Sequence, residues 1–197
     1  MAKIKSALEI ALERTDSVIS NKNSIGQFEA KQKGKRLANE FLHGEAKSLE
    51  TELEKASGDE LVSLKQGIFD ILISQITLPT TKDELIRIEA AGQGLFIIIA
   101  NKHFGEIVKQ FSQLLKQYLD EAANYEEAIK KQYGPKLRQK EEELSRRLGR
   151  HVKLDPFQDP EFVAFFNQHM NALKANYEGA VNEVKEEAKR LFETPEQ

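Results

Sequence analysis

The chain has no cysteine among its 197 residues. Disulfide bonds, thiolate metal sites and cysteine nucleophiles are therefore excluded together, and a reducing compartment fits this composition. Long apolar runs are also missing, because the two most apolar stretches, 67–79 and 94–100, fall far short of the ~20 residues of a membrane-spanning helix. Charged residues interrupt the N-terminus before the apolar core of a signal peptide could form. We therefore expect a cytoplasmic protein.

Proline is scarce, and its positions are informative. The five prolines stand at 79, 135, 156, 160 and 195, so residues 1–78 and 80–134 are free of the strongest helix breaker. Both stretches are rich in Ala, Leu, Glu, Lys, Gln and Arg, which lose least on entering a helix. The sequence predicts an all-α protein: an elongated antiparallel helical bundle with coiled-coil-like packing and five or six helices.

Apolar residues recur at helical spacing along most of the chain and predict where its helices begin and end. A first helix is expected to end at a polar turn near 20–24, and a second to run from 25 to about 56. Residues 57–60 contain a capping pattern that begins a third helix, which Pro79 ends. A second capping pattern, over 81–84, begins the fourth.

One long helix over 82–133 is predicted to dominate the fold. At 1.5 Å per residue it would approach ~75 Å, so it either projects as a stalk or breaks near Gly92, Gly94 or Gly105. The pair Gly134-Pro135 is expected to end it, since glycine suits the position after a helix and proline cannot continue one.

The expected organisation is a single domain in three parts. Residues 1–133 form the helical bundle, residues 134–159 a basic helical connector, and residues 160–197 a C-terminal helix that packs back on the bundle. Asp159 and Pro160 suit the N-cap and the first position of that last helix.

Two short motifs suggest chemistry but lack the surroundings that the chemistry needs. Glu40 and His43 have the Glu-x-x-His spacing of carboxylate-bridged di-iron bundles, which need the pattern twice, and it occurs once. The glycines of 91–94 follow no predicted strand and precede no Gly-Lys-Ser/Thr sequence. We therefore predict no catalytic, metal-binding or cofactor-binding residue. Close contact between helices is the simplest explanation of the glycines at 92 and 94, and further contact points of this kind are Gly34, Gly44, Gly67, Gly105 and Gly179.

Charge is segregated along the chain, although the formal net charge is only −3. Nine basic and three acidic residues lie between 130 and 153, whereas nine acidic and four basic residues lie between 155 and 197. The segment 130–153 is therefore a candidate basic arm for phosphate backbones or an acidic protein surface. Alternatively, the basic and acidic helices neutralise each other within the fold or across a dimer, and we favour this interpretation. The candidate surface for an anionic partner is formed by Lys130, Lys131, Lys136, Arg138, Lys140, Arg146, Arg147, Arg150 and Lys153.

The opening residues 4–15, with the sequence IKSALEIALERT, resemble the start of a loose group of uncharacterised bacterial all-helical proteins of unknown function. This resemblance implies a bacterial, cytoplasmic, helical protein. It carries no activity, ligand or site that could be transferred.

These observations together favour a non-enzymatic scaffolding or protein-interaction protein. Its expected partner is itself, as a homo-oligomer, or another protein, with no membrane partner and no cofactor. The alternative is an RNA-, ribosome- or DNA-associated protein that binds through residues 130–153. An enzyme is least favoured, because no acid–base pair or activated nucleophile can be assembled from this sequence.

Overall fold

Helices make up nearly all of the described chain. The computed structural model describes residues 7–44 and 49–194, with side chains from residue 24 onward. Within these ranges the chain contains six α-helices, one short 3-10 helix and no strand, which confirms the all-α prediction. The elements are α1 (Ala7–Leu42), α2 (Leu49–Leu53), α3 (Gly58–Gln75), α4 (Lys82–Ile99), α5 (Lys102–Leu148), η1 (Pro156–Gln158) and α6 (Pro160–Glu193).

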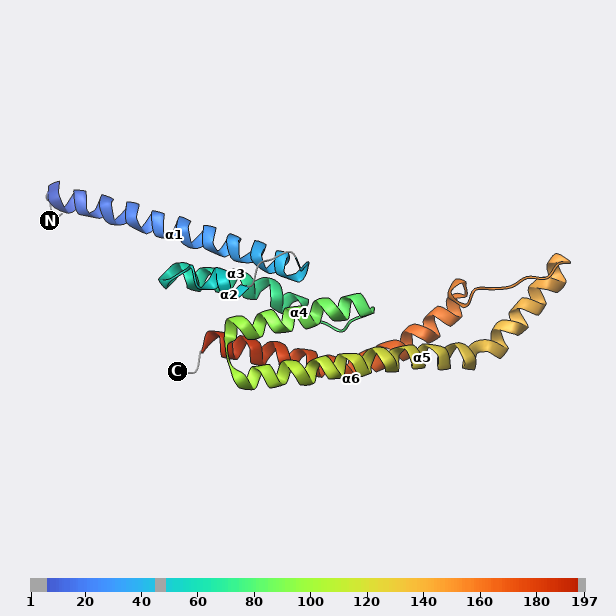
Figure 1. The fold of residues 1–197 in the computed structure, drawn as a ribbon. Helices are drawn as coiled ribbons and strands as arrows, with labels where there is room; N and C mark the ends of the chain where they lie inside the picture. Colours follow the sequence, from blue (N-terminus) through green and yellow to red (C-terminus); the bar gives the residue numbers. More distant parts are fainter. Residues whose placement is uncertain (1–6, 45–48, 195–197) are drawn as a thin grey trace, which may run out of the picture.

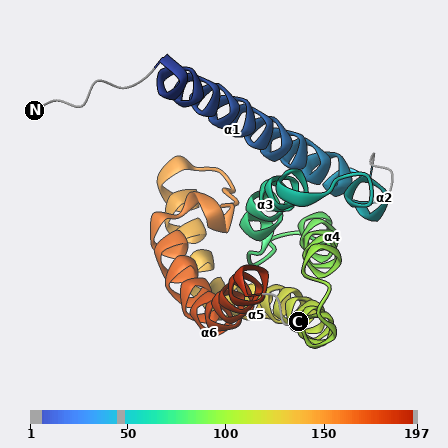
Figure 2. The same ribbon diagram turned by 90° about the vertical axis from the view of Figure 1, so that its left-hand side faces the viewer.

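The long helices lie side by side in layers, as Figure 1 and Figure 2 show. Helix α1 packs along α3, and α4 lies between α3 and the pair formed by α5 and α6. Beyond α4 this pair continues alone to the far end of the molecule (Figure 1). We call residues 125–170, which make this extension, the arm, and the rest of the described chain the body.

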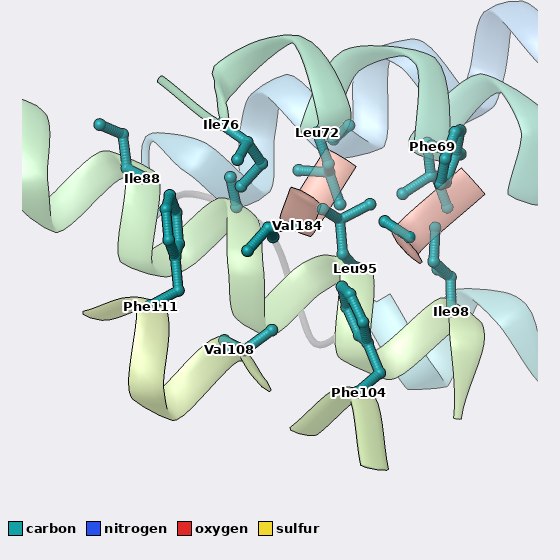
Figure 3. Close-up of a cluster of buried hydrophobic side chains, with 14 of the residues drawn as sticks. Phe69, Leu72, Ile76, Ile88, Leu95, Ile98, Phe104, Val108, Phe111 and Val184 are labelled. Atoms are coloured by element: carbon teal, nitrogen blue, oxygen red, sulfur yellow. The ribbon is translucent and has the colours of Figure 1, made fainter. Parts of the chain in front are cut away.

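The body is held together by one apolar cluster that α3, α4, α5 and α6 share. Leu72, Leu95 and Phe104 are completely buried there, and Figure 3 shows them meeting Val184 of α6 between the helices. Burial of such a side chain stabilises the fold by about 1.5–3 kcal/mol. The cluster therefore fixes the order of these four helices.

Two glycines allow α1 and α3 to touch backbone to backbone. A methyl group on Gly67 would clash with the carbonyl oxygen of Lys31, and one on Gly34 would clash with the carbonyl oxygen of Leu64. The prediction of close contact is confirmed at these positions, and also at Gly105, which packs under the ring of Phe96. It is wrong for the glycines at 44 and 179, where an added methyl group would meet nothing within 4 Å.

Helix α1 does not turn at residues 20–24, which corrects the predicted boundary. The polar residues there lower helix propensity by only a few tenths of a kcal/mol each, and without a proline the helix continues. It ends at Leu42 because Gly44 adopts φ +72°, the left-handed conformation that follows many helices. The second predicted helix, 25–56, is thus the end of α1 followed by the separate short helix α2.

The predicted helix over 82–133 is two helices, and its break lies at none of the three candidate glycines. Ala100 adopts φ 55° and ψ 32°, and the side chain of Asn101 then accepts a hydrogen bond from the backbone N–H of Phe104 at 3.1 Å. Caps on both sides of this link stabilise a sharp reversal. Gly92 and Gly94 instead lie inside α4 against side chains of Val108, Leu72 and Phe41.

Gly134-Pro135 does not end a helix either, since α5 continues to Leu148. Proline inside a helix removes one backbone hydrogen bond at a cost of ~3 kcal/mol, but packing can offset this. Tyr133, before the proline, packs against Phe162 of α6, and Leu137, after it, packs against the same apolar cluster. Helix α5 bends within the arm (Figure 1) and ends where Gly149 adopts φ 65°.

Two predicted helix starts are confirmed in atomic detail. The Thr81 side chain accepts the backbone N–H of Glu84 at 3.2 Å, and the Glu84 carboxylate accepts the N–H of Thr80 in return. The Asp159 side chain accepts the N–H of Glu161 at 3.1 Å, with Pro160 as the first residue of α6.

Candidate functional site: the basic arm

The base of the arm is closed by a polar network around Asp159. This carboxylate is 8% exposed and accepts two hydrogen bonds from the Lys140 ammonium, at 2.9 and 2.7 Å. It also accepts the hydroxyl of Tyr133 at 2.9 Å. Glu161 then binds Lys140 at 2.5 Å and Lys136 at 3.0 Å. These contacts join the last third of α5 to the first turn of α6.

The network shifts the pKa values of its members. Burial alone would raise the pKa of Asp159, but the hydrogen bonds from Lys140 and Tyr133 outweigh burial and hold this pKa below its usual value. Hydrogen bonds to Asp159 and Glu161 raise the pKa of Lys140. Burial, followed by the hydrogen bond to Asp159, raises the pKa of Tyr133. All three groups therefore keep fixed protonation states near neutral pH.

A small apolar cluster lies beside this network. Ile129, Tyr133 and Phe162 are buried, and four side chains that include Phe165 and Phe166 pack around them. The ring of Phe157, in η1, contacts Phe162 and Phe166 edge to face, with centroids 5.2 and 5.3 Å apart. The arm is thus a helical hairpin with its own minor core.

The structure separates the nine predicted basic residues into two groups. Four are paired: Lys136 and Lys140 with the start of α6, Lys130 with Glu126, and Arg146 with Glu142. The other five are exposed and make no ion pair within the described part of the chain: Lys131, Arg138, Arg147, Arg150 and Lys153.

The acidic end of α6 does not cover the basic segment. Helix α6 runs away from the arm tip (Figure 1), and two of its last glutamates, Glu186 and Glu187, bind Lys189 and Arg190 of the same helix. Among the described residues, the ion pairs of the basic segment are made by Asp159 and Glu161 at the start of α6 and by Glu126 and Glu142 of α5 itself. At the arm tip an open hollow of about 670 Å³ is lined by Arg138, Arg146, Arg150 and His151, with Glu141 and Glu142 beside them.

Sequence reasoning missed that Tyr133 and Asp159 belong to this site. Asp159 is predicted as a helix cap and is one of the nine acidic residues of 155–197, but Lys140 lies 19 residues before it. No spacing rule links the two, because their meeting depends on how the hairpin closes. The only available signal was a carboxylate N-cap that directly follows a basic helix.

The other prominent surface feature is α1. Its N-terminal half runs past the ends of the helices on which the rest of α1 packs, as Figure 1 shows. Ile25 and Phe28 are 57% and 63% exposed, and the first buried side chain along this helix, among those described, is Ala30. Apolar side chains near the middle of a 36-residue helix thus face solvent.

Neither a cluster of metal ligands nor a membrane-spanning helix is found among the described residues. Three or more His, Asp or Glu side chains do not gather anywhere in the described chain as metal ligands would. None of its described helices combines the length and apolarity that crossing a bilayer requires.

The fold and the site define the class as an elongated all-α protein with a helical arm. Residues 50–190 match a family described as "Family of unknown function (DUF6657)", and the chain belongs to that family. The matched region covers the arm and most of the body but begins after residues 4–15, on which the resemblance to bacterial helical proteins rests. Comparisons with curated proteins and with solved structures found no match.

Proposed function

We propose that the protein is a non-enzymatic cytoplasmic scaffold that binds a helical partner, a second copy of itself or another protein, through the N-terminal half of α1. The observation that carries this proposal is the overhang of α1, where Ile25 and Phe28 are exposed. The absence of cysteine supports a reducing location. The lack of any catalytic motif in the sequence supports the non-enzymatic part.

A free helix of this length needs a partner for physical reasons. Helices in proteins draw most of their stability from the packing of an apolar face and little from intrinsic propensity. In the sequence, Ile10 and Val18 stand at helical spacing on the same side of the helix as Ile25 and Phe28, so apolar positions continue along the overhanging part. A second helix lying along this stripe would provide the missing packing.

The test compares two pairs of exposed apolar residues. Ile25→Lys with Phe28→Lys alters the α1 surface, while Val62→Lys with Ile86→Lys alters side chains of similar exposure, 67% and 64%, in the body. Light scattering and affinity capture should show a stable oligomer or one dominant partner for the natural chain and for the body variant. The α1 variant should lose this oligomer or this partner. A natural chain that is strictly monomeric and captures no partner contradicts the proposal.

A second candidate function is association with RNA or DNA through the arm. The observation that favours it is that five exposed basic residues of the arm make no ion pair within the described chain and the acidic end of α6 lies elsewhere. Exposed lysine and arginine side chains can neutralise phosphates, and binding then weakens steeply with salt.

Charge reversal at the arm tip tests this second candidate. Arg146→Glu, Arg147→Glu and Arg150→Glu together should abolish binding to a single-stranded or duplex oligonucleotide at low salt. The matched control reverses three exposed lysines of the body, Lys82, Lys102 and Lys109, and should retain binding. The slope of log affinity against log salt should be about −0.7 to −0.9 per phosphate contacted. An absence of binding at low salt eliminates this function.

A further inference from the structure

We propose that two copies of the chain form an antiparallel dimer in which the arm tip of each copy binds the groove between α5 and α6 of the other. This inference rests on the proposed scaffolding function and names a surface and a partner for it. It concerns a different surface from the overhang of α1, so the two can be tested separately.

The groove lies in the body, on the layer furthest from α1 (Figure 2). It is about 720 Å³ in volume, and Ile107 and Leu114 of α5 and Val184 of α6 contribute apolar side chains to its lining. Its charged lining comes from α6, where Glu183, Glu186 and Glu187 outnumber the single cation Arg190. Glu186 and Glu187 pair with Lys189 and Arg190 of the same helix, whereas Glu183 makes no ion pair within the described chain. An apolar floor with a negative rim suits an apolar side chain that has basic neighbours.

The arm tip has the complementary chemistry. Leu148, the last residue of α5, is 56% exposed. Arg146, Arg147 and Arg150 surround it in sequence and are all exposed. A leucine among three arginines would place its side chain in the groove and its charges against the glutamates at the rim.

A chain cannot make this contact with itself. Leu148 lies 38 residues beyond Gln110 along α5, which corresponds to roughly 57 Å in a straight helix. Figure 1 places the arm tip and the C-terminal end of α6 at opposite ends of the molecule. The contact must therefore join two copies.

A two-fold axis relating the two copies makes this dimer a closed assembly. If two copies lie antiparallel, with the axis near the middle of α5, the tip of each reaches the groove of the other. Both contacts then form at once, and each copy uses the same two surfaces. This arrangement also neutralises the basic segment across a dimer, although the acidic end of α6 in the same chain does not cover it.

The test is a charge exchange between the two surfaces, measured on the full chain by sedimentation equilibrium. Arg147→Glu with Arg150→Glu should raise the dimer dissociation constant about tenfold or more, and Glu183→Arg with Glu186→Arg should do the same. The four substitutions combined should bring it back to within about threefold of the natural value. Lys82→Glu with Lys102→Glu, in the body, is the matched control and should change little.

Disulfide formation gives an independent readout, because the chain has no cysteine of its own. A mixture of a Leu148→Cys chain and a Gln110→Cys chain should form a mixed disulfide under mild oxidation. Leu148→Cys mixed with Val62→Cys, an exposed position on α3, should not.

The outcomes separate this inference from the scaffolding proposal. The dimer should persist in the α1 variant, Ile25→Lys with Phe28→Lys, and be lost in the arm variant, Arg147→Glu with Arg150→Glu. This result supports the antiparallel arrangement. A dimer that only the α1 variant loses overturns it and leaves the scaffold proposal standing. Failure of the fourfold variant to recover, together with an absence of the mixed disulfide, also overturns it.

Discussion

The body and the arm are both helical, but different forces hold them. The body has a large cluster of completely buried apolar side chains and a glycine contact that brings α1 and α3 together. The arm has three buried side chains and a charged network centred on one carboxylate. Apolar packing responds little to pH, whereas a network of ionised groups depends on it. The body and the arm should therefore unfold under different conditions.

The largest expected effect comes from emptying each core in turn. Phe104→Ala should lower the free energy of unfolding of the body by about 3–5 kcal/mol, because it removes a completely buried ring. Phe162→Ala removes an equally buried ring from the arm, where little else is packed. It should speed amide hydrogen exchange over residues 125–148 and leave the main thermal transition nearly unchanged. If both variants lower that transition equally, the two regions unfold as one unit.

The glycine contact should give the next largest effect. Gly67→Ala forces the backbones of α1 and α3 apart, so it should lower the free energy of unfolding by about 1–3 kcal/mol despite alanine's better helix propensity. Gly179→Ala is the matched control, since nothing lies within 4 Å of its added methyl group. It should raise stability by up to about 1 kcal/mol. Chemical denaturation measures both, and equal effects would contradict a tight crossing of the two helices.

Within the arm, Asp159→Asn isolates the charge of the network. Asparagine still caps a helix, so the start of α6 should persist, while Lys140 loses one of its two carboxylate partners and keeps Glu161. The arm should lose about 1–2 kcal/mol of protection in hydrogen exchange. Glu142→Gln, which breaks only a surface pair with Arg146, should have no measurable effect. Loss of protection in the body would contradict a network confined to the arm.

The smallest effect is expected from mild acid. The pKa values of Asp159 and Glu161 are below their usual values in the folded protein. Their contribution is therefore complete above the unfolded pKa values and is lost as pH falls through the folded ones. Hydrogen exchange of the arm should begin to accelerate relative to the body below about pH 5. Asp159→Asn should weaken this dependence, and an arm that stays protected at pH 3 would show that its apolar cluster suffices.

The sequence alone determined the helical class and several helix starts. Helix-forming composition and the scarcity of proline act locally, so they predict helices wherever they occur. Caps are equally local: Thr81 with Glu84, and Asp159 with Pro160, work through backbone groups within one turn. The rule that a glycine inside a helix marks a close contact was right at Gly34 and Gly67 and wrong at Gly44 and Gly179, so composition alone did not select the contacting pair.

The tertiary structure decided which of the predicted helix ends are absent and which charged side chains form pairs. Proline at 135 is tolerated because Tyr133 packs on Phe162 of α6 and Leu137 packs on the same cluster, and Phe162 lies some 30 residues away along the chain. The reversal at Ala100 brings α5 back against α4, with Phe104 in the shared core. Only the closed hairpin brings Lys140 to Asp159 and leaves Arg147 and Arg150 exposed. Sequence encodes local preference, whereas these outcomes depend on contacts between segments that only folding brings together.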